Sequence, residues 1–296
     1  MRMKKIILII TLVVVGALAW YLFIKPYDYL AVVKVKAIPG TINQSIKSWV
    51  HSVDINATMD QEDINNLEQR ISFSDSIFSY KWKIIPLTDS TSKIKVFIKD
   101  INNSFNNRIT IPFSDTDFEK RSKNTILNFT DKLFDHIKNF KVTIKGEDRF
   151  EGTYCAYVSI KGTQIKKANG MKQNYLLLDG FIVANKMELN GQPIIEVTKW
   201  DMETDSIYYN FCYPIIKNDS LPKHKLIKYK QLESKKAIKA IYNGNYITSD
   251  RAWYALIDYA AKNNISIEKK PFEIFHNNPI GGDALRWKAE IFMPIK

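Results

Sequence analysis

Two carboxylates near the end of the chain have the surroundings best suited to chemistry. Glu273 lies in the stretch "PFEIF" and Glu290 in "RWKAEIFMPI", and aromatic side chains flank both. A carboxylate among aromatic rings attracts a cation through its charge and through the quadrupole of the rings. It acts instead as a general base toward water when its pKa is raised. The ordinary alternative for each acid is a surface salt bridge with a nearby lysine.

Other reactive residue types do not gather into a recognisable motif. The four histidines (His51, His136, His224 and His276) are far apart, and none has a Cys or His partner at metal-ligand spacing. The chain has no Gly-rich phosphate loop and no G-x-S-x-G elbow. We therefore expect neither a metal site nor a cofactor. The two cysteines, Cys155 and Cys212, are expected in strands as buried thiols, with a disulfide between them as the alternative in an exported domain.

The last strand shows how Glu290 would be placed. Side chains alternate between the two faces of a strand. One face then carries Leu285, Trp287, Ala289, Ile291 and Met293, and the other carries Arg286, Lys288, Glu290 and Phe292. We expect the apolar face to meet helices and Glu290 to face a groove beside Phe292.

Residues 146–296 contain an internal duplication. Each copy runs strand, helix, a strand led by proline and a final strand that ends in Pro-Ile. The leading and closing prolines are Pro193 and Pro214 in the first copy, and Pro271 and Pro294 in the second. One helix cannot cover both faces of its own small sheet. The duplication therefore predicts one continuous sheet with both helices on one face and a concave groove on the other.

The second copy resembles a known family. Its helix, "ITSDRAWYALIDYAAKNNI", could be capped by Ser249 or Asp250. The stretches "YNGNY", "PFEIFHNNP" and "WKAEIFMPI" surround this helix in the order found in the GyrI-like domain, the effector-binding module of AraC- and MerR-type regulators. The resemblance implies a tandem βαββ fold that binds hydrophobic, often cationic small molecules, and some members are thought to hydrolyse ligands. The sequence has no recognisable helix-turn-helix, so the role of a transcription factor is not carried over.

Together these observations predict a ligand-binding site in the C-terminal half. Its candidate residues are Glu290, Glu273, Tyr246, Tyr242, Trp253, Phe275, Phe292 and Tyr209. Counted back from the closing proline, the counterpart of Glu290 in the first copy is Asn210, so the charge lies in one half only. The alternative for the aromatic residues is a place in the core.

Residues 27–145 show a second, weaker resemblance. A strand over 29–37, a short helix ending near Trp49, alternating strands including "NRITIPF", and a long helix capped by Ser114 or Asp115 follow one another. A polar loop is expected over 54–76. This order resembles the START-like helix-grip fold of the SRPBCC type, in which a sheet and a helix close around an apolar cavity.

The first 26 residues predict a membrane anchor. Nineteen residues from Ile6 to Ile24 carry no charge, enough for a helix to span about 30 Å of hydrocarbon. Arg2, Lys4 and Lys5 precede them and favour a cytoplasmic N-terminus with the bulk of the chain outside. The alternative is a signal peptide cleaved after Ala19, within "Ala-Leu-Ala".

The expected fold class is α+β, with an anchor over 1–26, a START-like domain over 27–145 and a GyrI-like domain over 146–296. The net charge of +12 comes from lysines scattered along the chain, which indicates a solvated surface and no nucleic-acid partner. We predict a bacterial membrane-anchored protein whose partners are a small hydrophobic or cationic molecule and the lipid bilayer through residues 6–24. The alternatives are a hydrolase that uses Glu290 or Glu273 as general base, and a structural envelope protein without a ligand.

Overall fold

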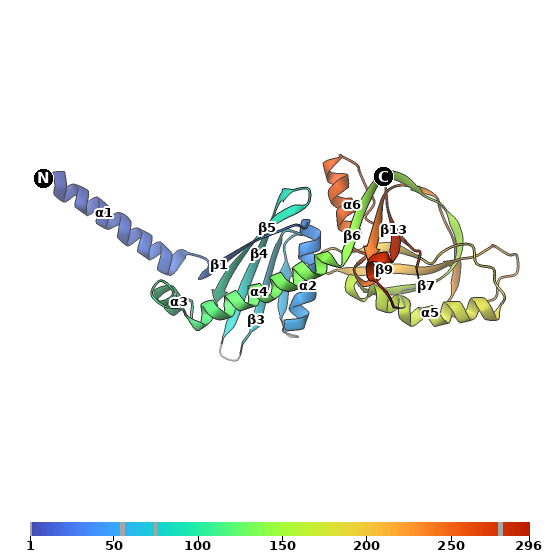
Figure 1. The fold of residues 1–296 in the computed structure, drawn as a ribbon, viewed down its shortest axis with the longest axis horizontal. Helices are drawn as coiled ribbons and strands as arrows, with labels where there is room; N and C mark the ends of the chain where they lie inside the picture. Colours follow the sequence, from blue (N-terminus) through green and yellow to red (C-terminus); the bar gives the residue numbers. More distant parts are fainter. Residues whose placement is uncertain (1, 54–56, 74–75, 278–280) are drawn as a thin grey trace. The chain divides into compact units, whose positions relative to one another are not determined.

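The computed structural model describes residues 2–53, 57–73, 76–277 and 281–296, and these form two compact units, Met1–Phe134 and Asp135–Lys296 (Figure 1). Each unit is built on one antiparallel sheet with helices packed against it, which gives the predicted α+β class. The predicted domain boundary at 145–146 lies inside a strand of the second unit. The Asn-Pro pair at 278–279 and part of the predicted 54–76 loop lie outside the described residues.

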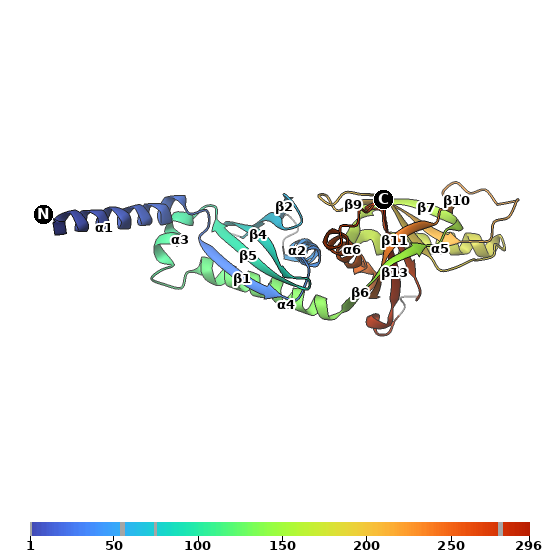
Figure 2. The same cartoon turned by 90° about the horizontal axis from the view of Figure 1, so that it is seen from above.

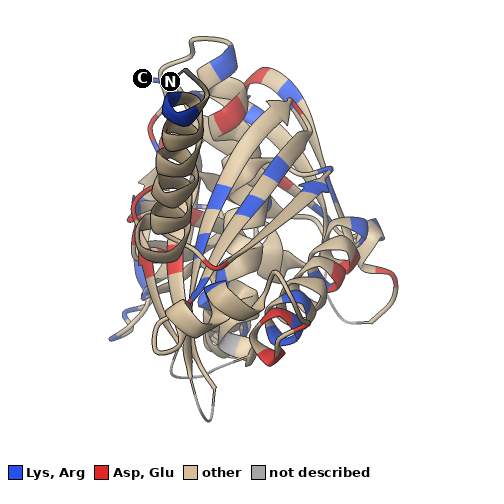
Figure 3. Cartoon of the chain, turned by 90° about the vertical axis from the view of Figure 1, so that its left-hand side faces the viewer, with Lys and Arg blue, Asp and Glu red and all other residues tan. Residues whose placement is uncertain are grey.

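The N-terminal unit begins with a long exposed helix. Its elements are α1 (Arg2–Ala19), the π-helical turn η1 (Trp20–Ile24), β1 (Tyr29–Val35), α2 (Pro39–Val53), β2 (Thr58–Gln61), β3 (Asn66–Ser72), β4 (Ile77–Thr88), β5 (Thr91–Asp100), α3 (Ser104–Thr110) and α4 (Asp117–Lys138). The stretch Met3–Ile24 has a mean hydropathy of 2.7 and lies wholly outside the core. Figure 3 shows α1 without charged residues except near its N-terminal end. By length and composition it is the one helix among the described residues that could cross a membrane, a criterion that a signal sequence also meets.

The sheet of this unit has the strand order β1-β5-β4-β3-β2. Aromatic rings fill the space between its inner face and the helices. Trp49 of α2 and Trp82 of β4 both contact Phe129 of α4, with ring centroids 5.3 and 4.8 Å apart. Trp49 Nε1 donates to Asn128 Oδ1 and Trp82 Nε1 to Gln69 Oε1, at 2.8 and 2.9 Å. The indole donors are thus paired inside a packed interior.

Three local predictions for this unit were wrong. The stretch "NRITIPF" forms most of α3 and the turn after it, not a strand, because the buried Arg108 is held from within a helical turn. The long helix begins later than predicted, and Thr116 Oγ1 accepts the Glu119 amide in place of a cap by Ser114 or Asp115. The predicted polar loop contains the strands β2 and β3, whose Leu67 and Ile71 are buried.

The C-terminal unit contains the two predicted copies with an additional strand beside each. Its elements are β6 (Phe140–Phe150), β7 (Thr153–Thr163), η2 (Gln164–Lys166), α5 (Lys167–Ala184), β8 (Ile194–Trp200), β9 (Ser206–Pro214), β10 (Lys228–Leu232), β11 (Lys235–Gly244), η3 (Tyr246–Thr248), α6 (Arg251–Lys262), β12 (Phe272–Phe275), η4 (Ala284–Arg286) and β13 (Lys288–Pro294). The strand order is β10-β7-β9-β8-β12-β13-β11-β6. The copies β7-α5-β8-β9 and β11-α6-β12-β13 share one sheet through the β8–β12 pair, which confirms that prediction.

The two faces of this sheet differ in what covers them. Leu178 and Ile182 of α5 and Trp253 and Leu256 of α6 belong to the same core cluster as Ile291 of β13, so both helices cover one face, as predicted. The other face was predicted to be a bare groove, and its centre is instead packed with apolar side chains. These are Phe150, Cys155, Ile194, Cys212, Leu232, Ala237, Phe272 and Phe292.

Ring stacking explains why the groove prediction was wrong. Strand β6 brings Phe150 over this face, and its ring stacks on Phe272 at 4.1 Å. The repeat pattern in the sequence does not include β6, which lies at one edge of this sheet. Cys155 and Cys212 are buried as free thiols within this cluster, as predicted.

Candidate functional site

The structure divides the eight predicted site residues between the two faces of the C-terminal sheet. Glu273 and the aromatic residues Phe275, Tyr209, Tyr242, Tyr246 and Trp253 lie on the face covered by helices. Glu290 pairs across the ladder with Ile274, and Phe292 pairs with Phe272 on the opposite face. The predicted set therefore does not form one site, and the two acids have to be considered separately.

Glu273 is fully buried beneath the helices. Strand β12 follows Pro271, and its alternation turns Phe272 to one face and Glu273 to the other. The carboxylate receives the Lys167 ammonium at 2.5 Å and the Trp253 Nε1 donor at 2.6 Å. Ser249 Oγ lies 3.1 Å from each of its oxygens. A buried charge is tolerated when it is paired and hydrogen-bonded in this way.

Lys167, the partner of Glu273, is not among the residues predicted for the site. It is the first residue of α5 and fully buried, with Nζ 2.7 Å from Ser249 Oγ and 4.5 Å from the centre of the Trp253 ring. The signal was present in the sequence: Lys167, Gly170, Leu178 and Ile182 form the buried stripe of α5 at helical spacing. A lysine on that buried stripe has to form an ion pair or extend its ammonium to solvent.

The elements around Lys167 are fixed by close contacts. Tyr209 donates its hydroxyl to the Lys167 carbonyl at 3.0 Å. Gly170 allows this approach, because a Cβ there would lie 2.1 Å from Tyr209 Oη. Burial, with a smaller effect of the Glu273 charge, raises the pKa of Tyr209. The first turn of α5 is thereby held against β9.

The other two predicted tyrosines, Tyr242 and Tyr246, donate their hydroxyls to backbone carbonyls. Tyr242 donates to the Asn245 carbonyl at 2.9 Å and lies 2.7 Å from Thr248 Oγ1. Tyr246 donates to the Lys288 carbonyl at 2.9 Å, and burial raises its pKa to about 12. Both tyrosines therefore support the loop that carries Ser249 and the start of α6.

A second polar group adjoins the Glu273 cluster. Asp250 occupies the N-cap position of α6 without capping it, contrary to prediction, since its carboxylate instead accepts Gln164 Nε2 at 2.9 Å and Arg251 at 3.0 Å. Arg251 Nε donates to His136 Nε2 at 3.3 Å. Burial, together with the Arg251 charge, lowers the pKa of His136 to about 4. Trp200 Nε1 also donates to Gln164, at 2.8 Å.

Glu290 has a different environment on the other face. Its carboxylate lies 2.6 Å from Lys288 Nζ, 3.2 Å from Lys239 Nζ and 3.5 Å from His276 Nε2, and 17% of its side chain is exposed. Burial raises the pKa of Glu290, but hydrogen bonds and charges from Lys288 and Lys239 outweigh it and hold the pKa below its usual value. This is an ion-pair network near the surface, the ordinary alternative considered for this acid.

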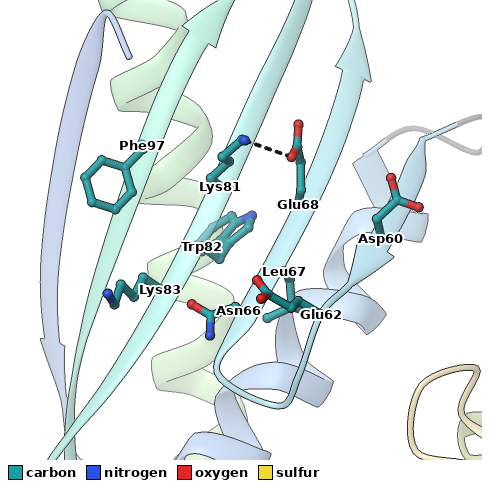
Figure 4. Close-up of a pocket in the computed structure, with 9 residues that line it drawn as sticks. All are labelled: Asp60, Glu62, Asn66, Leu67, Glu68, Lys81, Trp82, Lys83 and Phe97. Atoms are coloured by element: carbon teal, nitrogen blue, oxygen red, sulfur yellow. Dashed lines mark ion pairs between the residues drawn. The ribbon is translucent and has the colours of Figure 1, made fainter. Parts of the chain in front are cut away.

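The N-terminal unit has a separate open pocket of about 320 Å³ (Figure 4). Its lining includes Glu68 and Lys81, whose charged groups pair at 3.2 Å, and the ring of Phe97. Lys81 projects toward Glu68 of the neighbouring strand in Figure 4, so these two charges satisfy one another. Among the described residues, no group of three or more His, Cys, Asp or Glu is arranged to hold a metal ion.

Several solved structures are similar to part of this chain. No curated protein matches the chain. The crystal structure of the EcmrR C-terminal domain is similar, with 15% identity and a TM-score of 0.43 over 53% of this chain and 98% of that one. The structure of SAV2435 bound to tetraphenylphosphonium has 14% identity and a TM-score of 0.36, over 52% of this chain and 94% of that one.

One similar structure contains DNA. The EcmrR–DNA complex has 14% identity and a TM-score of 0.45, over 64% of this chain and 70% of that one. The absence of a nucleic-acid partner for this chain stays a prediction. The START-like resemblance of residues 27–145 is not confirmed by these comparisons.

The family comparison concerns the unit that contains Glu273. Residues 157–296 match the model of the GyrI-like small molecule binding domain, and this range includes both copies of the repeat from the middle of β7 onward. The shared sheet with both helices on one face is the architecture that the sequence resemblance implied. The C-terminal part of this chain is thus similar, over residues 157–296, to the GyrI-like small molecule binding domain.

Proposed function

We propose that this protein is a membrane-anchored receptor for a small apolar cation, which its GyrI-like domain binds at Glu273. The observation that carries the proposal is the buried carboxylate with a cation already on it. The Lys167 ammonium touches Glu273 and lies 4.5 Å from the centre of the Trp253 ring. A carboxylate and an aromatic face together form a site for positive charge. An external cation would occupy this place when Lys167 leaves it.

The replacement of the Lys167 ammonium by an apolar cation is favoured because the two cations differ in hydration. A lysine ammonium is a compact and strongly hydrated charge, so its return to water is favourable. A ligand with delocalised charge and apolar substituents loses less hydration on entry and gains contact with Trp253. For Lys167 to leave, its side chain has to rotate away from Glu273, and the first turn of α5 has to give up the Tyr209 hydrogen bond that holds it against β9. The sequence pattern pointed equally to Glu290, but the complete burial of Glu273 makes it the stronger candidate.

The anchor is part of the proposal. The uncharged stretch up to Ile24 is not covered by other parts of the protein over most of its length. This is expected of a helix that faces lipid. The basic residues before it favour a cytoplasmic N-terminus, with both folded units outside the cytoplasm. The domain would then meet ligands on the outer side of the membrane.

Hydrolysis is the weaker candidate. A general base that works near neutral pH needs a raised pKa. The lysines around Glu290 lower its pKa instead, and Glu273 is occupied by Lys167. We therefore propose binding without turnover.

The test is calorimetric titration of the full chain in lipid nanodiscs with tetraphenylphosphonium, an apolar ion with a delocalised charge. Empty nanodiscs correct for partition of the ion into lipid. The double variant Lys167→Met with Glu273→Gln removes both buried charges together, so that neither is left unpaired. We expect its affinity to be at least about tenfold lower than that of the wild type, roughly 1.4 kcal/mol.

Glu290→Gln is the matched control, because it neutralises an acid on the opposite face of the same sheet. We expect it to change the affinity less than about twofold, well under 1 kcal/mol. A loss confined to Glu290→Gln would move the site to the other face. No binding by the wild type, or equal affinity in all three proteins, would refute a cation site at Glu273.

A further inference from the structure

The segment from Ile101 to Phe113 presents an apolar stripe to the surroundings of the N-terminal unit. Ile101, Phe105, Ile109 and Phe113 recur every four residues and are all exposed, Phe105 by 47% and Phe113 by 86%. Residues four apart in a helix lie on one face. Phe105 and Ile109 therefore share one outward face of α3 (Ser104–Thr110), and Ile101 and Phe113 are exposed in the turns that flank the helix.

A buried ion pair fixes α3 to the end of the hydrophobic helix. Arg108 of α3 and Asp28 are both buried, with Nε 2.7 Å from Oδ1. The same guanidinium donates to the carbonyl of Leu22 at 3.0 Å and to that of Lys25. It thus occupies carbonyls that the end of a helix leaves without partners. In both views α3 lies beside the C-terminal end of α1 (Figure 1, Figure 2).

The stripe lies at the level of the last turn of the proposed span. The ring of Phe105 stacks on the ring of Phe23 with centroids 5.6 Å apart. Phe23 belongs to the apolar stretch that ends at Ile24, and it is itself exposed. If that stretch crosses a bilayer, Phe105 is carried to the membrane surface together with Phe23. Trp20 and Tyr21 mark the same level, where aromatic side chains concentrate in membrane proteins.

The composition of the segment suits a lipid interface. Between Ile101 and Phe113 there is no acidic residue, and the only basic residue is Arg108, which is buried. Acids reappear at Asp115 and Asp117, beyond the stripe. We propose that the 101–113 segment inserts its apolar stripe into the outer interface of the lipid bilayer, as a second attachment beside the transmembrane helix. The inference rests on the proposed membrane anchor.

Insertion would give the N-terminal unit a defined orientation on the membrane. A single helix allows the attached unit to tilt and swivel. Arg108 fixes the angle between α1 and α3, and a second contact with lipid then fixes the angle between the unit and the bilayer. An amphipathic segment in such a contact buries its apolar face about 5–10 Å below the headgroups.

The test uses a fluorophore that reports contact with lipid. Phe113→Cys in the full chain is labelled with an environment-sensitive dye and reconstituted into phosphatidylcholine vesicles. The native Cys155 and Cys212 are buried, and the wild-type chain treated with the same dye measures any background. The matched control is Ser90→Cys, in the exposed turn between β4 and β5 at the far end of the strands. Lipids with a spin label near the headgroup serve as quenchers.

We expect quenching at position 113 to be at least about threefold stronger than at position 90, as for a side chain in the interface. Equal weak quenching at both positions, in protein that floats with the vesicles, would overturn the interfacial contact and leave the anchor standing. Failure of the chain to float would remove the anchor and this inference with it. A third outcome is quenching that appears only at low lipid-to-protein ratio, in protein that can be crosslinked as dimers. That result would assign the apolar stripe to contact with a second copy of the chain and overturn the proposal.

Discussion

Replacing Lys167 by methionine should destabilise the C-terminal unit by leaving the Glu273 carboxylate buried without its cation. Both side chains of this pair are fully shielded from water, and Nζ lies 2.5 Å from Oε1. Loss of one partner of a buried ion pair typically costs about 3–5 kcal/mol. Two donors would remain on the carboxylate, Trp253 Nε1 and Ser249 Oγ. We therefore expect a loss of about 3 kcal/mol, at the lower end of that range.

The double variant Lys167→Met with Glu273→Gln separates the cost of an unpaired charge from the value of the pair. Removing both charges together is often neutral or stabilising for buried pairs. The amide keeps an acceptor for Trp253. We expect the double variant to recover at least about 2 kcal/mol relative to Lys167→Met, the size of coupling found for directly interacting residues.

The measurement has to report on the C-terminal unit alone, because a chain with two units need not unfold in one step. Native-state hydrogen exchange of peptides from β8, β9, β12 and β13 gives the free energy of opening of that sheet. Peptides from β4 and β5 of the other unit serve as an internal reference. The matched control is Lys262→Met, which breaks a pair of 2.6 Å with Asp258 on an exposed helix face. It should cost less than about 1 kcal/mol. A Lys167→Met chain as stable as this control would refute the reasoning.

Two further changes test the packing around the site. Burial and Arg251 lower the pKa of His136 from 6.5 to about 4, so the unfolded chain binds more protons than the folded one between these pH values. Stability should therefore fall by up to about 3 kcal/mol as the pH drops through that window, and His136→Asn should flatten the pH dependence of exchange in β6 and α6. Gly170→Ala should destabilise by about 1–3 kcal/mol despite the better helix propensity of alanine. The added Cβ meets Tyr209 Oη, so Tyr209→Phe should restore most of the loss in the same exchange measurement.

The duplicated architecture could be predicted because its signals are local. Proline closes a strand because it lacks the amide that the next ladder bond needs, and Pro214 and Pro294 both end strands at the predicted places. The alternation of Ala289, Ile291 and Met293 assigned the helix-covered face of β13 correctly. Periodicity and turn residues depend on neighbours within a few positions, and a sequence displays those directly.

The burial of Glu273 depends on residues that are distant in the sequence. Lys167 precedes it by 106 residues. Glu273 and Glu290 both alternate with apolar residues in their strands, so the local pattern does not distinguish them. The difference arises because β6 and its Phe150 close one face while α5 brings a lysine under the other. The same limit applies to α3, where the partner of Arg108 is Asp28, 80 residues away.

The buried ammonium of Lys167 gives the proposed site a property that the Glu273 carboxylate would not have alone. Without Lys167, Glu273 would be an unpaired negative charge inside the core, and such a buried charge destabilises the fold unless a cation pairs with it. With Lys167 in place the carboxylate is paired in the absence of a ligand, and the proposed cation would have to compete with a tethered charge. The same tether connects the site to the first turn of α5, because the Lys167 carbonyl accepts the Tyr209 hydroxyl. A cation that displaces the side chain would therefore act on the helix that carries it. That coupling requires no second site, since one residue contributes both the competing charge and the start of the helix.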